Sequence, residues 1–428
     1  MTDERIIADL SRTDITADER LRALRKVKER IDAGKIERDR EGRFVNNHIH
    51  TCYSFSPYTP TSAVFYAWRA GLSTAGIMDH DSVGGTREFI EAGSIMEMPV
   101  TCGFECRVNV KGTPLDGRRI NNPDQVSCAY VAMHGIPHGS IDKAEEVLSV
   151  LRKKRNERNV KMCENITRIT EPFGITLDFL RDVLPISMAR EGGGVTERHI
   201  LFALTRKIID KYTERSDALR FVGRLIGKEI DPKTYDKLLT APDNFYPYDI
   251  LGVLKSSLVS RFYIDADDEC IGISDFSDLA DELGAISAYA YLGDVGESPT
   301  GDKKAQKFED DYLPVLFDTL KKVRFKAITY MPSRNSKEQL ETVMKYCRDN
   351  GFFEISGEDI NSPRQSFICP SLELPEYAHL RTSTYALIGH EISASRDLSL
   401  SMFSQRTIDQ IPDLNERIKQ YALIGGIK

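Results

Sequence analysis

The sequence predicts an α/β protein built on a parallel sheet or barrel. From Phe44 to Val110, the short apolar segments "RFVNNHIH", "TAGIMDH" and "PVTCGFECRVNV" alternate with a helical run, "PTSAVFYAWRAG". Strands that alternate with helices in this way are typical of parallel α/β folds. The chain has 428 residues, which is enough for about two or three domains, or for one large barrel with additions.

The first 42 residues are predicted to form a helical extension. In "ADERLRALRKVKERIDAG", Leu21, Leu24, Val27 and Ile31 recur at intervals of three and four residues, which gives an amphipathic helix ending at Gly34. We expect this helix to pack on its own domain, and a partner-binding helix is the alternative. The acidic N-terminus has no apolar leader segment, so we expect a cytoplasmic protein.

A barrel domain is predicted over residues 43–370, with a helical insertion around residues 140–265. The insertion contains the charged run "SIDKAEEVLSVLRKKRNERNVKMCENITRI", a glycine-rich "REGGGV" and the helix "TERHILFALTRKIIDKY". Such a charge run is typical of a solvated face, and a ligand-binding face is the alternative. Strands and helices alternate again in "LADELGAISAYAYLGDV", "LKKVRFKAITYM", "SKEQLETVMKYCRDNG" and "FFEISGEDIN", and residues 371–428 form a helical C-terminal extension.

The composition narrows the classes of partner. The formal net charge of -7 disfavours a protein that lives on nucleic acid or on an anionic membrane. No stretch is apolar enough to suggest a membrane span. The eight cysteines contain no C-x-x-C pair, which removes support for a zinc ribbon or a thioredoxin-like motif. A small-molecule substrate is therefore the expected partner, and homo-oligomerisation is left open.

Three segments carry residues that bind metals. His48 and His50 lie two apart on a predicted strand, so both imidazoles point to one face and converge on one point. His80 follows the next strand and has Asp79 beside it, an arrangement that orients metal-bound histidines. Glu105 lies within an apolar run, where an unpaired carboxylate is costly. The alternatives are structural histidines and a buried ion pair.

These segments together resemble a known family. "HIHTCYS", "GIMDHDSVGG" and "GFE", in this order, resemble the PHP domain, the family named for polymerase and histidinol phosphatase. "RKKRNERNVKMCENIT", "TERHILFAL" and "NGFFEISGEDIN" are similar to later motifs of its phosphoesterase branch, and the resemblance covers roughly residues 44 to 365. It implies a distorted seven-stranded β/α barrel with up to three divalent metals at the carboxyl ends of its strands.

The resemblance also assigns metal ligands. It implies that His48 and His50 hold a first metal together with Asp359, that Glu105 bridges two metals, and that His199 belongs to the second.

The family's histidine on the fourth strand is harder to place in this sequence. His134 in "YVAMHGIPHGS" is the chosen counterpart, with His138 and Tyr130 as rivals. The resemblance assigns His80 to the third metal.

Four positions depart from the family pattern. Asn46 and Phe55 stand where the family usually has aspartates, and Tyr291 and Asn361 stand where it usually has histidines. The resemblance places both Phe55 and Asn361 at the third metal. An aromatic ring cannot bind a hard cation, and an amide binds one only weakly. We therefore expect two divalent ions (Mn, Zn or Fe), with the third site doubtful. Phe55 is expected to form a remodelled pocket wall, and Tyr291 to contact the substrate.

Two adjacent divalent metals can activate water for the hydrolysis of a phosphate ester. Arg198, beside the predicted ligand on its helix, is the best candidate to bind the phosphate, followed by Arg107 and Arg334. Asp79 or His80 could protonate the leaving oxygen. The sequence thus favours a metal-dependent phosphoesterase acting on a small phosphorylated metabolite, such as a nucleotide or sugar phosphate. The alternatives are an amide or lactone hydrolase on the same metals and a degenerate domain that binds without turnover.

Overall fold

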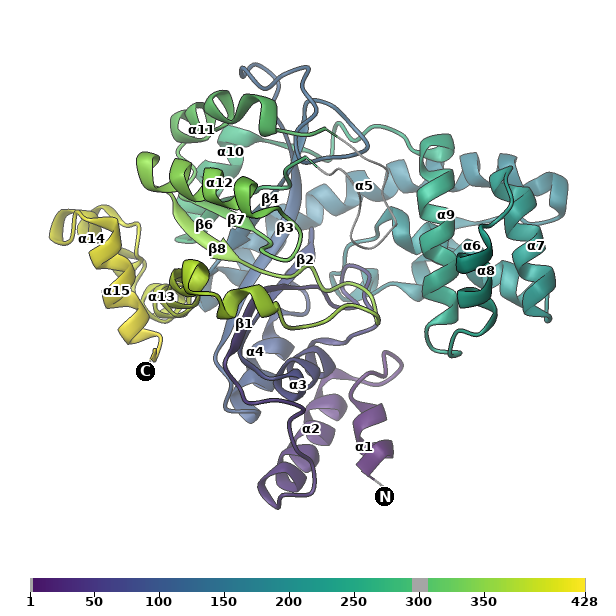
Figure 1. The fold of residues 1–428 in the computed structure, drawn as a ribbon, viewed down its shortest axis with the longest axis horizontal. Coiled ribbons are helices and arrows are strands. Elements are labelled where there is room, and N and C mark those ends of the chain that lie inside the picture. Colours follow the sequence, from purple (N-terminus) through teal and green to yellow (C-terminus); the bar gives the residue numbers. More distant parts are fainter. Residues whose placement is uncertain (1–2, 295–306, 428) are drawn as a thin grey trace.

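Seven strands form a nearly closed barrel at the centre of the computed structural model, which describes residues 3–294 and 307–427 (Figure 1). The order around the barrel is β1-β2-β3-β4-β6-β7-β8, and the short β5 (Ile271–Gly272) pairs with β3 off this path. A bridge between Ile49 and Ile360 joins the two edges. The seven strands are β1 (Phe44–Ile49), β2 (Leu72–His80), β3 (Val100–Asn109), β4 (Cys128–His134), β6 (Ile286–Ala290), β7 (Ala327–Tyr330) and β8 (Phe353–Ser356).

The predicted fold class, a distorted seven-stranded α/β barrel, is confirmed. The expectation of a purely parallel sheet is wrong at β4, which runs antiparallel to both β3 and β6. The reason is the connection between β3 and β4, residues 110–127, which contains no helix. A parallel pair needs a long crossover, usually helical, whereas an antiparallel strand can return directly.

Helices cover the outside of the barrel. They are α3 (Pro60–Ala70), α4 (Thr86–Ile95), α10 (Ile273–Leu283), α11 (Leu313–Lys322) and α12 (Lys337–Asn350). α3 shows how the sequence sets the ends of a helix: Thr59 caps its first turn, Pro60 occupies the first position, and Gly71 ends it at φ 100°. Apolar side chains that alternate along the strands, such as Phe104 and Ile328, pack beneath these helices.

The C-terminal extension closes the barrel at the end where most strands begin. α13 (Ala378–Arg396) packs Tyr385 and Leu387 against inward-facing residues such as Ala288 and Phe353. The Glu391 carboxylate accepts a hydrogen bond from the Cys102 amide at the start of β3. α14 (Gln405–Gln410) and α15 (Leu414–Ile424) pack on the outer side of α13 (Figure 1). Any functional site must therefore open at the opposite end.

The N-terminal helices α1 (Asp3–Asp9) and α2 (Ala17–Asp32) pack on the barrel domain, against α3 and α4 (Figure 1). The predicted stripe Leu21, Leu24 and Val27 is buried there. Arg20 forms a buried ion pair with Glu88 of α4 at 2.6 Å. α2 ends at Asp32, two residues before the predicted stop.

The helical insertion has a hydrophobic core of its own and lies to one side of the barrel (Figure 1). It comprises α5 (Ile141–Thr170), α6 (Glu197–Lys211), α7 (Arg215–Ile226), α8 (Pro232–Leu239) and α9 (Tyr246–Phe262). The interpretation of the charge run on α5 as a solvated face is wrong for Arg152, Arg155 and Arg158, which are buried. These arginines recur every three residues, so they form one face of the helix. Among the described helices, none is both long and apolar enough to cross a membrane.

Candidate metal centre

Two imidazoles and a carboxylate converge where β1 and β8 end. The Nε2 atoms of His48 and His50 lie 3.2 Å apart, and His50 Nε2 lies 3.2 Å from Asp359 Oδ1. Gly357 makes this approach feasible, because a Cβ there would lie 2.6 Å from the His48 Cβ. The structure thus brings together the three residues assigned to a first metal. Both histidines are buried, whereas the Asp359 side chain is 40% exposed and faces the open end.

A second group shares His50 with the first. His80 and Glu105 are neighbours in the register of β2 and β3, and His80 Nδ1 lies 3.1 Å from Glu105 Oε2. The rings of His50 and His80 are 4.6 Å apart between centroids. Ligand atoms of His50, His80 and Glu105 all lie within 4.8 Å of one another. Five predicted ligands from four separate segments therefore gather at one mouth of the barrel.

A chain of hydrogen bonds fixes the orientation of His50. The Ser54 hydroxyl donates to Asp79 Oδ1 at 2.6 Å and lies 3.2 Å from His50 Nδ1. Because the Ser54 proton is used on Asp79, the Ser54 oxygen must accept the proton of His50 Nδ1. The Nε2 lone pair of His50 then points at the cluster, as a metal ligand requires. Sequence reasoning missed Ser54, although its place in the "HTCYS" loop was a usable signal.

Asp79, predicted as a proton donor, does not face the cluster. Its carboxylate accepts the Thr51 amide and the Ser54 hydroxyl at Oδ1 and the Thr51 hydroxyl at Oδ2, each at 2.6 Å. Burial raises the pKa of Asp79, whereas His50 and the three donated hydrogen bonds oppose this by favouring the carboxylate, which organises the loop 51–54. This geometry gives Asp79 a positioning role.

The pKa values in the cluster reflect burial among charges. Burial and, to a lesser extent, the neighbouring His50 lower the pKa of His48 to about 4, against the opposing effect of the Asp359 carboxylate. Burial also lowers the pKa of His50, but the carboxylates of Asp359, Glu105 and Asp79 outweigh it, so the net pKa is raised. Burial raises the pKa of Glu105 to about 8. Burial thus disfavours the charged forms of His48 and Glu105.

The donor set fits divalent metal ions. Imidazole nitrogens and carboxylate oxygens suit Zn, Mn and Fe. Glu105 is buried, and its neighbour His80 does not supply a positive charge. Burial lowers the pKa of His80 well below its usual value, so its imidazole is neutral. A cation between these groups removes the cost of burying the carboxylate. The residues that would hold metal are His48, His50 and Asp359 on one side, and His80 and Glu105 on the other.

Two departures from the family pattern have structural explanations. Asn46 accepts the amides of His48 and Glu358 and donates to the carbonyls of Glu358 and Phe367, so it ties β1 to the segment after β8. Asn361 donates its amide to Asp359 Oδ1 at 2.6 Å. Both asparagines thereby support the cluster through hydrogen bonds, and an aspartate at either position would lose a donor.

Phe55 forms an aromatic wall beside the cluster. Its ring packs edge-on against His199 at 5.0 Å and against Phe202 at 5.5 Å, and the Arg198 guanidinium carbon lies 5.2 Å from its centroid. Its φ of 112° is rare for a residue with a side chain. Such strain persists only where the surroundings hold it, here through burial against α6 and Tyr248 of α9.

His199 and Arg198 lie at the start of α6, close to this wall. The His199 Nδ1 accepts the Thr196 amide at 3.0 Å, which leaves Nε2 to point elsewhere. Burial lowers the pKa of His199 to about 3. Among the described residues, His199 does not join either ligand group. Burial acts to raise the pKa of Asp359, but His50, His48 and, least of the three, the Arg198 charge together hold it well below its usual value.

The three candidates for the family's fourth-strand histidine, Tyr130, His134 and His138, lie at different distances from the open end of the barrel. Because β4 is antiparallel, Tyr130 pairs with Arg107 at the open end, whereas His134 pairs with Gly103 nearer the closed end. The Tyr130 ring lies 5.8 Å from that of His80. His134 is buried below the cluster, and His138 binds Glu391 of α13 at 3.0 Å.

The other residues predicted to contact the substrate, Tyr291, Arg334 and Arg107, differ in burial and in hydrogen-bond partners. Tyr291 is buried, and its hydroxyl donates to Asp310 at 2.6 Å rather than facing the cluster. Arg334 follows β7 and is half-buried. Arg107 is buried and donates to Tyr130, Glu197 and Glu269. These contacts saturate Arg107 within the protein.

Arg107 belongs to an ion network that fastens the insertion to the barrel. Arg155 binds Asp81, next to His80, and reaches Glu197 at 3.1 Å, while Arg158 binds Glu197 and Glu269. The three-residue spacing of the buried arginines on α5 is the sequence signal for this network, and it lies within the charge run interpreted above as a solvated face.

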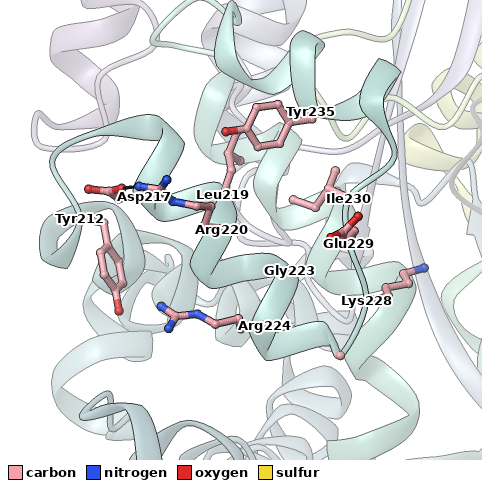
Figure 2. Close-up of a pocket in the computed structure, with 11 residues that line it drawn as sticks. Tyr212, Asp217, Leu219, Arg220, Gly223, Arg224, Lys228, Glu229, Ile230 and Tyr235 are labelled. Atoms are coloured by element: carbon pink, nitrogen blue, oxygen red, sulfur yellow. Dashed lines mark hydrogen bonds and ion pairs between the residues drawn. The ribbon is translucent and has the colours of Figure 1, made fainter.

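A separate pocket of about 870 Å³ lies within the insertion, between α7 and α8 (Figure 2). Tyr212, Tyr235, Arg220 and Arg224 line it, and none of the predicted site residues does.

Comparisons with known proteins support the fold. No family model matches the chain, and no curated protein matches it by sequence. A solved structure of a putative metal-dependent phosphoesterase from Bifidobacterium adolescentis is similar, with a TM-score of 0.51 and 19% identity over 78% of this chain and 95% of that one. An amidohydrolase from Chromobacterium violaceum, solved with bound sulfate and no metal, has a TM-score of 0.50 and 17% identity over 80% and 97%. At these identities the likeness shows a shared barrel fold.

Proposed function

We propose that this protein is a metal-dependent phosphoesterase of the PHP type that hydrolyses a small phosphorylated metabolite. The observation that carries the proposal is the convergence of His48, His50, Asp359, His80 and Glu105 at one mouth of the barrel. When bound, a pair of divalent metals supplies Lewis acidity toward a phosphoryl oxygen and a water that is nucleophilic at neutral pH.

We assign separate roles to the residues of the cluster. His48, His50 and Asp359 would hold one cation, with Asn361 orienting the carboxylate and Ser54 orienting His50. Glu105 and His80 would hold the second cation or lie beside it. Because an imidazole with a lowered pKa is neutral near pH 7, His80 can accept a proton when it is not a ligand.

Arg198 favours a phosphorylated substrate. It lies close enough to Asp359 to lower the pKa of that carboxylate, and it is partly exposed beside the cluster. A guanidinium there can bind two oxygens of a phosphate. Phe55 packs against both Arg198 and Phe202. The organic part of a substrate whose phosphate binds Arg198 would therefore contact this aromatic wall. The likeness to a putative metal-dependent phosphoesterase supports the proposal.

The experiment is metal-stimulated phosphate release from a panel of nucleotides and sugar phosphates. We expect turnover with Mn²⁺ or Zn²⁺ and its loss in His48→Ala and Glu105→Ala. His379→Ala is the matched control, because His379 is partly exposed on α13 and its only described ion pair is with Glu354. Phosphate release that is equal in His48→Ala and in the wild type contradicts the proposal.

A second candidate is an amide or lactone hydrolase on the same centre. The observation that favours it is the shared fold with the amidohydrolase. Turnover of amides or lactones, with all phosphate esters inert, establishes this candidate instead. If the centre binds metal and no ester, amide or lactone reacts, the protein is a binding module.

A further inference from the structure

Two cysteines meet where the helical insertion returns to the barrel. The sulfur atoms of Cys128, the first residue of β4, and Cys270, just before β5, lie 3.9 Å apart. All eight cysteines lie in the described part of the chain and are free thiols, and this is the one pair with a sulfur–sulfur hydrogen bond. With Ala266, the pair forms a small apolar cluster separate from the main cores.

The strand pairing explains why these residues meet. Asn109 at the end of β3 pairs with Cys128 on one side and with Gly272 of β5 on the other. The Asn109 amide also donates to the Cys270 carbonyl at 3.1 Å. Both cysteines are thus held against the same residue, although 142 positions separate them in the sequence.

The surroundings suit oxidation of the pair. The residues before Cys270 include the exposed Asp265, Asp267 and Asp268, so the buried Cys270 directly follows a segment at the surface. The hydrogen bond from the Cys270 thiol lowers the pKa of Cys128; burial opposes this, and the nearby Arg107 guanidinium adds to it. The thiolate is the form that reacts with peroxides.

We propose that Cys128 and Cys270 form a disulfide under a hydroperoxide oxidant, which clamps the end of the insertion to the barrel. The Cys128 thiolate attacks a peroxide oxygen, which gives a sulfenic acid and releases hydroxide. The Cys270 thiol then attacks the sulfenic sulfur, the S–S bond forms, and water leaves. Two thiols and one hydrogen peroxide thus give one disulfide and two waters, with the two electrons passing to the peroxide. This inference does not depend on the proposed hydrolase activity.

The clamp acts on the ion network described above. Glu269, adjacent to Cys270, binds both Arg107 and Arg158. Fixing Cys270 to β4 therefore restrains the carboxylate that joins the insertion to the barrel. The S–S bond ties Cys270 to β4, so the segment around Cys270 can open less far than in the reduced protein.

The experiment treats the full-length protein with excess hydrogen peroxide, blocks thiols with an alkylating agent, and analyses a non-reduced digest by mass spectrometry. We expect a linked pair of peptides containing Cys128 and Cys270 in the wild type and in Cys347→Ala, a control for another buried cysteine. Cys128→Ala and Cys270→Ala should lack the link while retaining the wild-type circular dichroism. Hydrogen exchange at residues 263–272 should slow on the order of tenfold on oxidation. Recovery of the two cysteines as separate, unlinked peptides after excess peroxide overturns the proposal.

Discussion

Replacing Asp79 by asparagine should weaken metal binding without touching a metal ligand. The carboxylate accepts three hydrogen bonds of 2.6 Å, from the Thr51 amide, the Thr51 hydroxyl and the Ser54 hydroxyl. In Asp79→Asn, the remaining amide oxygen can keep the hydrogen bonds from the Thr51 amide and the Ser54 hydroxyl, but both are now bonds to a neutral group. The new NH₂ group faces the Thr51 hydroxyl, which donates a hydrogen bond in the wild type. Ser54 then donates to a neutral amide oxygen instead of a carboxylate, so its oxygen is held less firmly against His50 Nδ1.

The size of the effect follows from these contacts. Hydrogen bonds to a charged group contribute about 1.5–3 kcal/mol each, so a partial loss should lower the unfolding free energy by about 2–3 kcal/mol. Disturbing a residue that orients a metal ligand typically lowers metal affinity by about 10- to 100-fold. We expect both effects in Asp79→Asn.

The assay is a competition between metal-depleted protein and a chromophoric chelator for Zn²⁺, run beside urea unfolding. Glu88→Gln is the matched control, because Glu88 is a buried carboxylate paired with Arg20 and belongs to neither ligand group. The control should lose stability and keep its metal affinity. Metal affinity in Asp79→Asn within twofold of the wild type, despite a loss of stability, would refute the reasoning.

Three further predictions can be checked with single variants. Glu88→Gln should lower the unfolding free energy by about 3 kcal/mol in urea, because it leaves Arg20 buried beside a neutral partner; a loss below 1 kcal/mol contradicts this. Burial lowers the pKa of His390 to about 4, and its Nδ1 accepts the Met402 amide, so the unfolded chain binds more protons below about pH 6.5. Stability should therefore fall as the pH drops from about 6.5 to 4, by roughly 3 kcal/mol from this group, and His390→Gln should flatten that part of the urea-derived profile. Asn361→Ala should weaken Zn²⁺ binding about tenfold in the chelator assay, since Asp359 loses its amide donor, and unchanged binding contradicts that role.

The barrel could be predicted because its signals are local. Short apolar segments separated by helical runs, and histidines and carboxylates that follow those segments, are visible in the order of residues alone. His48 and His50 share a face because strand residues two apart always do, and the structure brings their Nε2 atoms to 3.2 Å.

The antiparallel β4 and the buried arginines could not be predicted in the same way. The direction of β4 depends on a connection without a helix, and it places Tyr130 rather than His134 beside His80. Arg155 lies on a helix whose neighbouring positions, such as Lys154, are exposed. Its burial depends on Asp81 and Glu197, which lie 74 and 42 residues away along the chain.

The most direct test is the metal content of protein purified without a chelator, measured by elemental analysis. The proposed centre predicts about two divalent ions per chain in the wild type and in His379→Ala, with a clear loss in His48→Ala and Glu105→Ala. Wild-type protein that carries no divalent metal, and takes up none when Mn²⁺ or Zn²⁺ is supplied, would contradict it.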